Sequence, residues 1–331
     1  MAGPKVDATV PEHPTAPPRP RLLLHIGTHK TGTSALQESL NSHRTLLLQR
    51  GIHYPDTSRP PWPHLPKHCS TFHAAVSDDA ALQADERDWL LGQARRPGVH
   101  TLLISEEGLS EPDERLPRFF EPLQAHLDIE VLCCLRRQDL FVEALYNQFT
   151  RERERREGRA PLVFARAASV RARLDYHALL ARWAAAGCRV HAADFEALRA
   201  GTGLMHWLGQ AGRLDLSGLT ERRINRSPDM RVALLLARWH RQRAEYDLGA
   251  VMRAAQDLAQ QRPAERQQHV LGHAERERLL ADLAPSNQRL AAEFQVQFDT
   301  SLPPHEPQYA SEMPDDLYLA QLLARMSMRS A

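Results

Sequence analysis

Residues Arg21–Leu40, RLLLHIGTHKTGTSALQESL, carry the strongest structural signal in this chain. They begin with an apolar run of the length of a buried strand, which stops at Gly27. A short polar loop follows as far as Ser34, and apolar residues then recur at helical spacing from Ala35 onward. A strand, a glycine-bearing loop and the start of a helix together predict a phosphate-binding loop, because backbone N–H groups and the helix dipole then point at one place.

The two glycines of this loop have the spacing of a nucleotide-binding P-loop, but the lysine is displaced. Gly27 and Gly32 match G-x-x-x-x-G, after which a P-loop continues with Lys and then Ser or Thr. Thr33 and Ser34 follow here instead, and the lysine lies inside the loop, as Lys30. The displaced cation indicates a ligand other than the β- and γ-phosphates of a magnesium-bound nucleotide.

The segment HIGTHKTGTSALQ resembles the 5′-phosphosulfate loop of the bacterial sulfotransferase family, whose usual form is close to H-x-G-x-x-K-T-G-T-T/S-x-L-Q. The resemblance implies 3′-phosphoadenosine 5′-phosphosulfate (PAPS) as sulfuryl donor and adenosine 3′,5′-bisphosphate (PAP) as product, with no metal ion. It implies that Lys30 is catalytic and meets the charge that builds on the bridging oxygen of the leaving phosphate. The residues implied to bind the cofactor here are those of the loop: Gly27, Thr28, His29, Lys30, Thr31, Gly32, Thr33 and Ser34.

A second segment, VLCCLRRQDLFVEALYNQF, resembles the 3′-phosphate element of the same family. In that element an arginine at a strand end and a serine eight residues later bind the 3′-phosphate. Arg136 matches the arginine, whose planar fork can bind phosphate through two hydrogen bonds. The serine position is Ala144, so one hydrogen bond to the cofactor should be missing. Further along, Asn225 and Ser227 match a short N-x-S element, and Ser227 before Pro228 is equally suited to cap a helix.

Transfer to an acceptor hydroxyl needs a general base, and the sequence leaves two candidates. The segment SEEGL resembles the family's S-S-E segment. Glu107 aligns with the family glutamate, and Glu106 aligns with the second serine. The other candidate is His68 in HLPKHCSTFH, because family members often carry a histidine after a Y-P turn like Tyr54-Pro55. The residues do not decide between Glu107 and His68.

Alternating strands and helices predict an α/β fold. Four short apolar runs are the expected strands: Leu22–Ile26, His100–Ser105, Ile129–Leu135 and Arg189–Ala192. Helical patterns lie between them, at Thr33–Gln49, Ala74–Gln93, Asp139–Glu157 and Asp175–Ala186. This alternation predicts a parallel sheet flanked by helices, the P-loop-like arrangement that the resemblance also implies. Ligands of such sheets bind beyond the carboxyl ends of the strands.

Composition and pattern divide the chain into three parts. Residues 1–20 contain six prolines and are expected to be a disordered N-terminus without the apolar core of a secretory signal. Residues 21–303 are expected to form the α/β domain, with a mostly helical C-terminal subdomain from about residue 222. Its predicted helices are Pro228–Arg243, Asp247–Gln261 and His273–Phe294. Residues 304–331 are expected to be a tail.

Several classes of function are disfavoured by what the chain lacks. A net charge of +1 over 331 residues gives no general attraction to nucleic acid. No apolar run has the length of a membrane span. The four cysteines form no C-x-x-C motif, which predicts reduced thiols in a cytoplasmic protein. Cys69 and His73 are spaced i, i+4 and could share a helix face in a zinc site, but Pro63 and Pro66 disfavour His64 on the same helix.

The charged run RERERREGR, Arg151–Arg159, is expected to extend the preceding helix, with Glu152 and Arg156 paired at i, i+4. A solvated helix end is the simpler interpretation of this run. The alternative is a basic rim that steers an anionic acceptor.

The expected function is transfer of a sulfuryl group from PAPS to a hydroxyl or amine of a carbohydrate, a lipid-linked sugar or a small metabolite. One alternative is a small-molecule kinase that uses ATP and magnesium, against which the absent P-loop lysine counts. The other is a non-catalytic nucleotide-binding protein on a degenerate sulfotransferase fold. The feature that favours this second alternative is Ala144.

Overall fold

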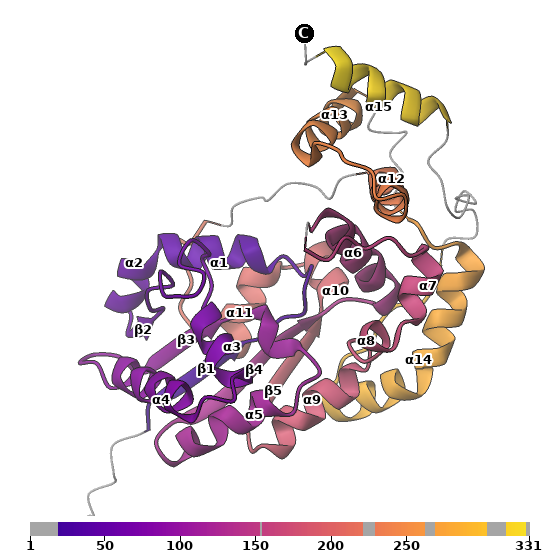
Figure 1. Ribbon diagram of the computed structural model, residues 1–331. Helices are drawn as coiled ribbons and strands as arrows, with labels where there is room; N and C mark the ends of the chain where they lie inside the picture. The colour runs from indigo at the N-terminus through magenta and orange to yellow at the C-terminus, as the bar shows by residue number, and fades with distance from the viewer. Residues whose placement is uncertain (1–18, 153, 221–228, 262–268, 303–315, 329–331) are drawn as a thin grey trace, which may run out of the picture.

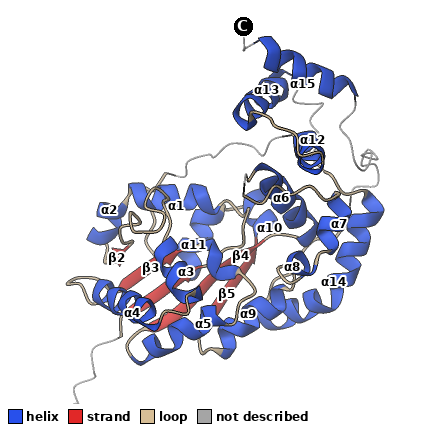
Figure 2. Ribbon diagram, viewed as in Figure 1, coloured by secondary structure: helices blue, strands red, loops and turns tan. Residues whose placement is uncertain are grey.

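A parallel five-stranded sheet, in the order β2-β3-β1-β4-β5, forms the centre of the molecule (Figures 1 and 2). The computed structural model describes residues 19–152, 154–220, 229–261, 269–302 and 316–328. The predicted parallel sheet is confirmed, with strand ends that differ by one or two residues from those expected. The strands are β1 (Arg21–His25), β2 (Ile52–His53), β3 (Thr101–Ser105), β4 (Asp128–Leu135) and β5 (Arg189–Asp194).

Both faces of the sheet are buried, which explains why its strands are nearly continuous apolar runs. Leu24 of β1 is in register with Ile104 of β3, and both belong to the core on one face. Their neighbours Leu23 and Leu103 belong to the core on the opposite face. Successive side chains of a strand point to opposite faces, so each strand contributes to both cores.

Helices cover each face of the sheet. The first face packs against α3 (Cys69–Val76), α4 (Ala80–Ala94), α5 (Arg115–Phe120), α9 (Tyr176–Ala185) and the second half of α14 (His273–Phe294). The opposite face packs against α1 (Thr33–Ser42), α2 (Arg44–Gln49), α10 (Phe195–Ala200) and α11 (Leu204–Gly212). Two short 3-10 helices, η1 (Glu107–Ser110) and η2 (Glu121–Ala125), follow β3 and α5.

The remaining helices build two further apolar clusters. One joins α6 (Gln138–Arg151), α7 (Pro161–Arg166), α8 (Ala168–Arg171), α12 (Met230–Arg241) and the first half of α14. The other joins the second side of α12 to α13 (Leu248–Gln261) and α15 (Asp316–Met328), which stand away from the sheet in Figure 1. Leu290 of α14 packs in the sheet core, so the helical C-terminal part is not one separate unit. The expected tail from residue 304 contains the helix α15.

Two predicted helices are each broken in two. The helix expected over 33–49 breaks at His43, whose Nδ1 lies 2.8 Å from the carbonyl oxygen of Ser39. The helix expected over 74–93 is two helices, because the backbone of Ser77 is extended. Asp79 then caps α4 by accepting hydrogen bonds from the N–H groups of Ala81 and Leu82.

The charged run after α6 does not continue the helix, so that prediction is wrong. α6 ends at Arg151, and the backbone of Glu152 is extended. Glu152 forms its ion pair with Arg155 at 2.7 Å instead of with Arg156. Arg156 adopts a left-handed conformation, with φ of 43°, which a continuing helix would not allow.

Candidate active site

The candidate phosphate loop leaves the sheet at Gly27. Thr28 still pairs with β4, since its N–H donates to the carbonyl of Cys134 at 3.1 Å. A Cβ atom on Gly27 would lie 2.9 Å from Nε2 of His25, so a larger residue does not fit. Gly32 caps α1 with φ of 77°, and Lys30 has φ of 69°. A side-chain-bearing residue rarely adopts this left-handed conformation, so the loop carries backbone strain at the lysine.

The N–H groups of this loop are available to a ligand. From residue 29 to residue 34, no backbone N–H donates a hydrogen bond to the described part of the chain. The hydroxyl of Thr31 donates to the carbonyl of Thr28 at 2.6 Å and so fixes the turn from inside. A row of free N–H groups that leads into the first turn of a helix is a binding site for an anion such as phosphate.

Lys30 brings a cation to the same loop. Its side chain is partly buried, and among the described residues its ammonium group has no hydrogen bond or ion pair. Burial lowers the pKa of Lys30, and the positive charge of Arg151 lowers it further, while Glu152 and Glu107 act in the opposite direction. A partly desolvated ammonium group without a counterion would be stabilised by an anionic ligand.

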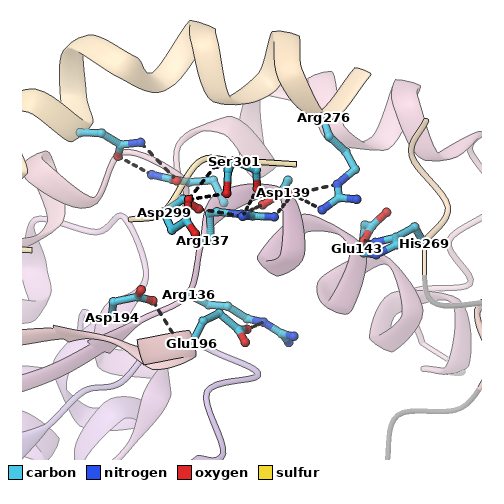
Figure 3. A network of polar contacts seen from close by, with 12 residues as sticks. Arg136, Arg137, Asp139, Glu143, Asp194, Glu196, His269, Arg276, Asp299 and Ser301 are labelled. Carbon is cyan, nitrogen blue, oxygen red and sulfur yellow. Dashed lines mark hydrogen bonds and ion pairs between the residues drawn. The ribbon is translucent and has the colours of Figure 1, made fainter. Parts of the chain in front are cut away.

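Arg136 lies beside the loop but is already bound to a carboxylate. Its Nε donates to Glu196 at 3.0 Å, and its Nη1 donates to the carbonyl of Lys30 at 3.3 Å. Figure 3 shows Arg136 next to Glu196, at the start of α10. A guanidinium group has five N–H donors, so others remain for a phosphate. No local sequence pattern predicts that Glu196 binds this arginine.

The rest of the segment that resembles a 3′-phosphate element makes contacts within the protein. Ala144 is a partly buried residue of α6 and offers no hydrogen bond from its side chain. Arg137 binds Asp139 through two hydrogen bonds of 2.8 and 3.0 Å, and Arg276 of α14 binds the same carboxylate at 2.8 Å (Figure 3). Burial favours the neutral acid, but the two arginines outweigh it and lower the pKa of Asp139. This network ties α6 to α14.

Two carboxylates at the end of β3 share one lysine. The Nζ atom of Lys67 lies 3.1 Å from Oε1 of Glu106 and 3.2 Å from Oε1 of Glu107. The other oxygen of Glu107 accepts a hydrogen bond of 3.0 Å from Gln37 of α1. Burial raises the pKa of Glu106. Burial acts the same way on Glu107, but Lys67 and then His29 outweigh it, so the pKa of Glu107 is lowered and the group is ionised at neutral pH.

His68, the second candidate base, is part of the protein interior. Its side chain packs edge-on against Tyr54, with ring centroids 4.6 Å apart. Its Nδ1 accepts a hydrogen bond of 3.1 Å from the N–H of Ser105. Burial lowers the pKa of His68 to about 3, so the imidazole is neutral. Of the two candidates, Glu107 is therefore the better placed to receive a proton from a bound molecule.

A chain of polar side chains links the loop to Glu107. Nδ1 of His25 lies 2.8 Å from Oγ of Ser105, which also accepts a hydrogen bond of 3.1 Å from Gln37. The same amide group of Gln37 bonds Glu107. Burial lowers the pKa of His25 to about 4. Sequence reasoning missed His25 and Gln37 as parts of the site, although both are letters of the loop motif H-x-G…L-Q.

A pocket of about 700 Å³ lies beside the loop and the carboxylates. We call it the acceptor pocket, and its size is in the range of small-molecule sites. His29 of the loop lines it, together with Lys67 and Glu106. Its apolar wall comes from Trp62, Leu65, Phe72 and Val76. Charged residues also line it, among them Glu152, Arg155 and Arg173.

Arg151 is a second cation near the loop that sequence reasoning did not single out. Its Nε donates to the carbonyl of Asn147 at 2.9 Å, and burial lowers its pKa. In the sequence, Arg151 is the first of several arginines in a charged run. It differs from the others in the structure because it is the last residue of α6.

Other sequence expectations lie away from this site. Asn225 and Ser227 fall outside the described residues. Within the described ranges, no group of three or more His, Cys, Asp or Glu side chains is arranged to hold a metal ion. The four cysteines are buried and free. Across the same ranges, no helix combines the length and apolar character that crossing a bilayer requires.

Neither a protein-family model nor a curated protein matches the chain. Among solved structures, the chain is similar to a sulfotransferase from Alicyclobacillus acidocaldarius. The two share 15% sequence identity and a TM-score of 0.47, over 85% of this chain and 98% of that one. A similarity this low carries no argument about the site, whose interpretation depends on its own residues.

Proposed function

We propose that this protein is a sulfotransferase that moves a sulfuryl group from PAPS to a hydroxyl or amine of a carbohydrate, a lipid-linked sugar or a small metabolite. One observation carries the proposal: the ammonium group of Lys30 lies in a loop of free N–H groups, beside a pocket walled by a lysine–carboxylate cluster. The resemblance of the loop sequence to the 5′-phosphosulfate loop supports the same donor.

Each group has a part in the transfer. The loop N–H groups hold the 5′-phosphate of the donor. Glu107 accepts the proton of the acceptor as its oxygen or nitrogen forms a bond to sulfur. The bond between sulfur and the bridging oxygen breaks, and its electron pair leaves with PAP. Lys30 stabilises the negative charge on that oxygen.

A 3′-phosphate would meet an arginine that a carboxylate already binds. Arg136 has N–H donors to offer, but Glu196 competes for it and Ala144 lacks a hydroxyl. These two features favour a second candidate function, a nucleotide-binding protein that transfers nothing.

Calorimetric titration and a transfer assay distinguish the candidates. We expect PAP to bind without magnesium, and labelled sulfate to pass from PAPS to a member of a panel of sugars and phenols. Binding of PAP without transfer to any acceptor would favour the non-catalytic protein. Binding of ATP only with magnesium would favour a kinase. Absence of PAP binding would refute the proposal.

Lys30→Ala tests the role of the loop cation. Removing the group that stabilises the developing charge should lower the transfer rate by about 100-fold or more, with the melting temperature unchanged. Arg166→Ala, which removes an exposed cation of α7, is the control and should keep the normal rate. A Lys30→Ala enzyme of normal turnover would contradict the assigned role.

A further inference from the structure

Lysine is rare in this chain. Of its 42 basic residues, the only lysines are Lys5, Lys30 and Lys67, and the rest are arginines. Lys30 and Lys67 are the lysines that the structure describes, and both lie at the candidate site. Arginine presents a planar fork suited to one carboxylate, whereas an ammonium group is compact and has three donors that can reach separate oxygens. The use of lysine at position 67 therefore fits a role in which one cation serves two acceptors.

The contacts of Lys67 show this arrangement. Its Nζ is 3.1 Å from Glu106 and 3.2 Å from Glu107. The side chain of Glu106 is 2% exposed, and its Oε1 also accepts a hydrogen bond of 2.8 Å from the N–H of Gly108. Glu106 is thus fixed by the backbone, and Lys67 is fixed by Glu106.

Glu107 is held from two sides by different parts of the fold. Lys67, from the segment before α3, binds one oxygen, and Gln37 of α1 binds the other at 3.0 Å. α1 is the helix that begins at the phosphate loop, and Lys67 lines the acceptor pocket. The carboxylate is therefore joined on one side to the helix that follows the loop, and on the other to a lysine of the pocket wall.

We infer that Lys67 is a positioning residue that fixes the carboxylate of Glu107 in place. The inference rests on the proposed function, in which Glu107 takes the proton of the acceptor. Glu106, which stands where the resembled family has a serine, is the anchor of this lysine. Its second oxygen is enclosed, so it is not available to a bound acceptor.

Lys67 also decides the charge of Glu107. Several other titratable groups interact electrostatically with this carboxylate, and they belong to different elements around it. They are Glu106 of its own segment, His25 of β1, His29 and Lys30 of the loop, Tyr54 after β2, and Cys69 of α3. Without Lys67, Glu106 and Glu107 would act on each other with no cation shared between them. Two neighbouring carboxylates without a shared cation bind a proton more readily.

A carboxyl titration tests the inference without any acceptor. In protein labelled with ¹³C-glutamate, the signal of Glu107 is assigned by comparison with Glu107→Gln and followed with pH. Lys67→Met should raise the titration midpoint of Glu107 by about one pH unit or more, and Lys67→Arg by less. Arg155→Met removes another cation of the pocket that binds Glu152, so it should leave the midpoint unchanged. The acidic limb of the transfer rate should move with the midpoint.

The outcomes separate this inference from the proposed function. An unmoved midpoint in Lys67→Met would overturn the role of Lys67, even in an enzyme that binds PAP and transfers sulfate. Failure of the wild type to bind PAP would instead refute the proposed function. If Lys67→Met does not fold, Lys67→Gln retains a hydrogen-bond donor without the charge and should show the same rise. If neither folds while Lys67→Arg does, the lysine is structural and the inference is wrong.

Discussion

Two neutral histidines lie on either side of the end of β3. His25 bonds the side chain of Ser105, and His68 bonds its backbone. Both imidazoles are almost fully buried, at 1% and 2% exposure. Protonation would place a desolvated charge in the protein interior, in the case of His25 just before Gly27 of the candidate phosphate loop. Each of these imidazoles therefore binds a proton less readily in the folded protein than in the unfolded chain.

This difference predicts acid sensitivity. The pKa falls from 6.5 to about 4 for His25 and to about 3 for His68, because both are buried. Only the unfolded chain binds these protons just below pH 6.5, so the stability is complete above that pH and falls as the pH drops toward 4. Between pH 7 and pH 5, protonation of each histidine in the unfolded chain should lower the free energy of unfolding by about 2 kcal/mol.

Urea unfolding at pH 7 and pH 5 checks the expectation. His68→Gln should lose about 2 kcal/mol less than the wild type between these two pH values, because the contribution of His68 is gone. His126→Gln, at an exposed position, should behave like the wild type. Equal losses in all three proteins would mean that His68 does not control the acid response.

The sequence predicts the loop of the candidate site better than its surroundings. Lys30, Gly27 and Gly32 belong to one short segment, so their spacing alone places them together. Lys67 meets Glu107 only because the segment before α3 folds against the end of β3. Arg151 lies close enough to Lys30 to lower its pKa, although the two residues are far apart in the sequence. Such contacts depend on tertiary packing, which a single sequence does not display.

At the scale of elements, α10 decides how Arg136 is used. Asp194 caps this helix by accepting a hydrogen bond of 3.0 Å from the N–H of Glu196, which sets the position of that residue. The side chain of Glu196 then binds Arg136 at 3.0 Å. A helix start that fixes a carboxylate beside the arginine reduces the positive charge available to a 3′-phosphate.

Glu196→Gln should therefore strengthen the binding of PAP, by about threefold to tenfold, because an opposing charge is removed. The affinity for adenosine 5′-phosphate, which lacks the 3′-phosphate, should not change. Calorimetric titration of both nucleotides measures the effect. Glu293→Gln, which removes an exposed carboxylate bound to His177, is the matched control. Equal gains for both nucleotides would show that Arg136 does not bind the 3′-phosphate.

The elements themselves were predictable to different degrees. The longer strands and α14 were predicted because their apolar patterns extend over several residues. The bounds of α14 agree with the prediction. β2 has two residues, which are too few to form a pattern. The end of α6 was missed because Arg151–Arg159 contains no proline and no glycine before Gly158. Backbone geometry at Glu152, and not a local sequence signal, ends that helix.

At the scale of the whole molecule, α12 joins two parts. Met230 and Leu234 pack in the cluster with α6, and Val232 and Leu236 pack with α13 and α15. The second cluster shares no buried residue with the two cores of the sheet. Its stability should therefore vary separately from that of the sheet.

Leu322→Ala tests this separation. Leu322 of α15 is fully buried, so its truncation should cost about 2–5 kcal/mol of local stability. Native-state hydrogen exchange should become faster in α13 and α15, while the sheet and the binding of PAP stay unchanged. Leu48→Ala, the same substitution at a residue that is 39% exposed, should have little effect anywhere. Faster exchange throughout the sheet would show one cooperative unit.

The scarcity of lysine has a practical consequence. A reagent that acylates primary amines meets only two side-chain targets in the described part of the chain, Lys30 and Lys67, and they stand at the loop and at the pocket wall. The mass added to each peptide after brief acylation then measures how well that amine is shielded. Mass spectrometry of the unmutated protein can in this way report which half of the site a molecule covers.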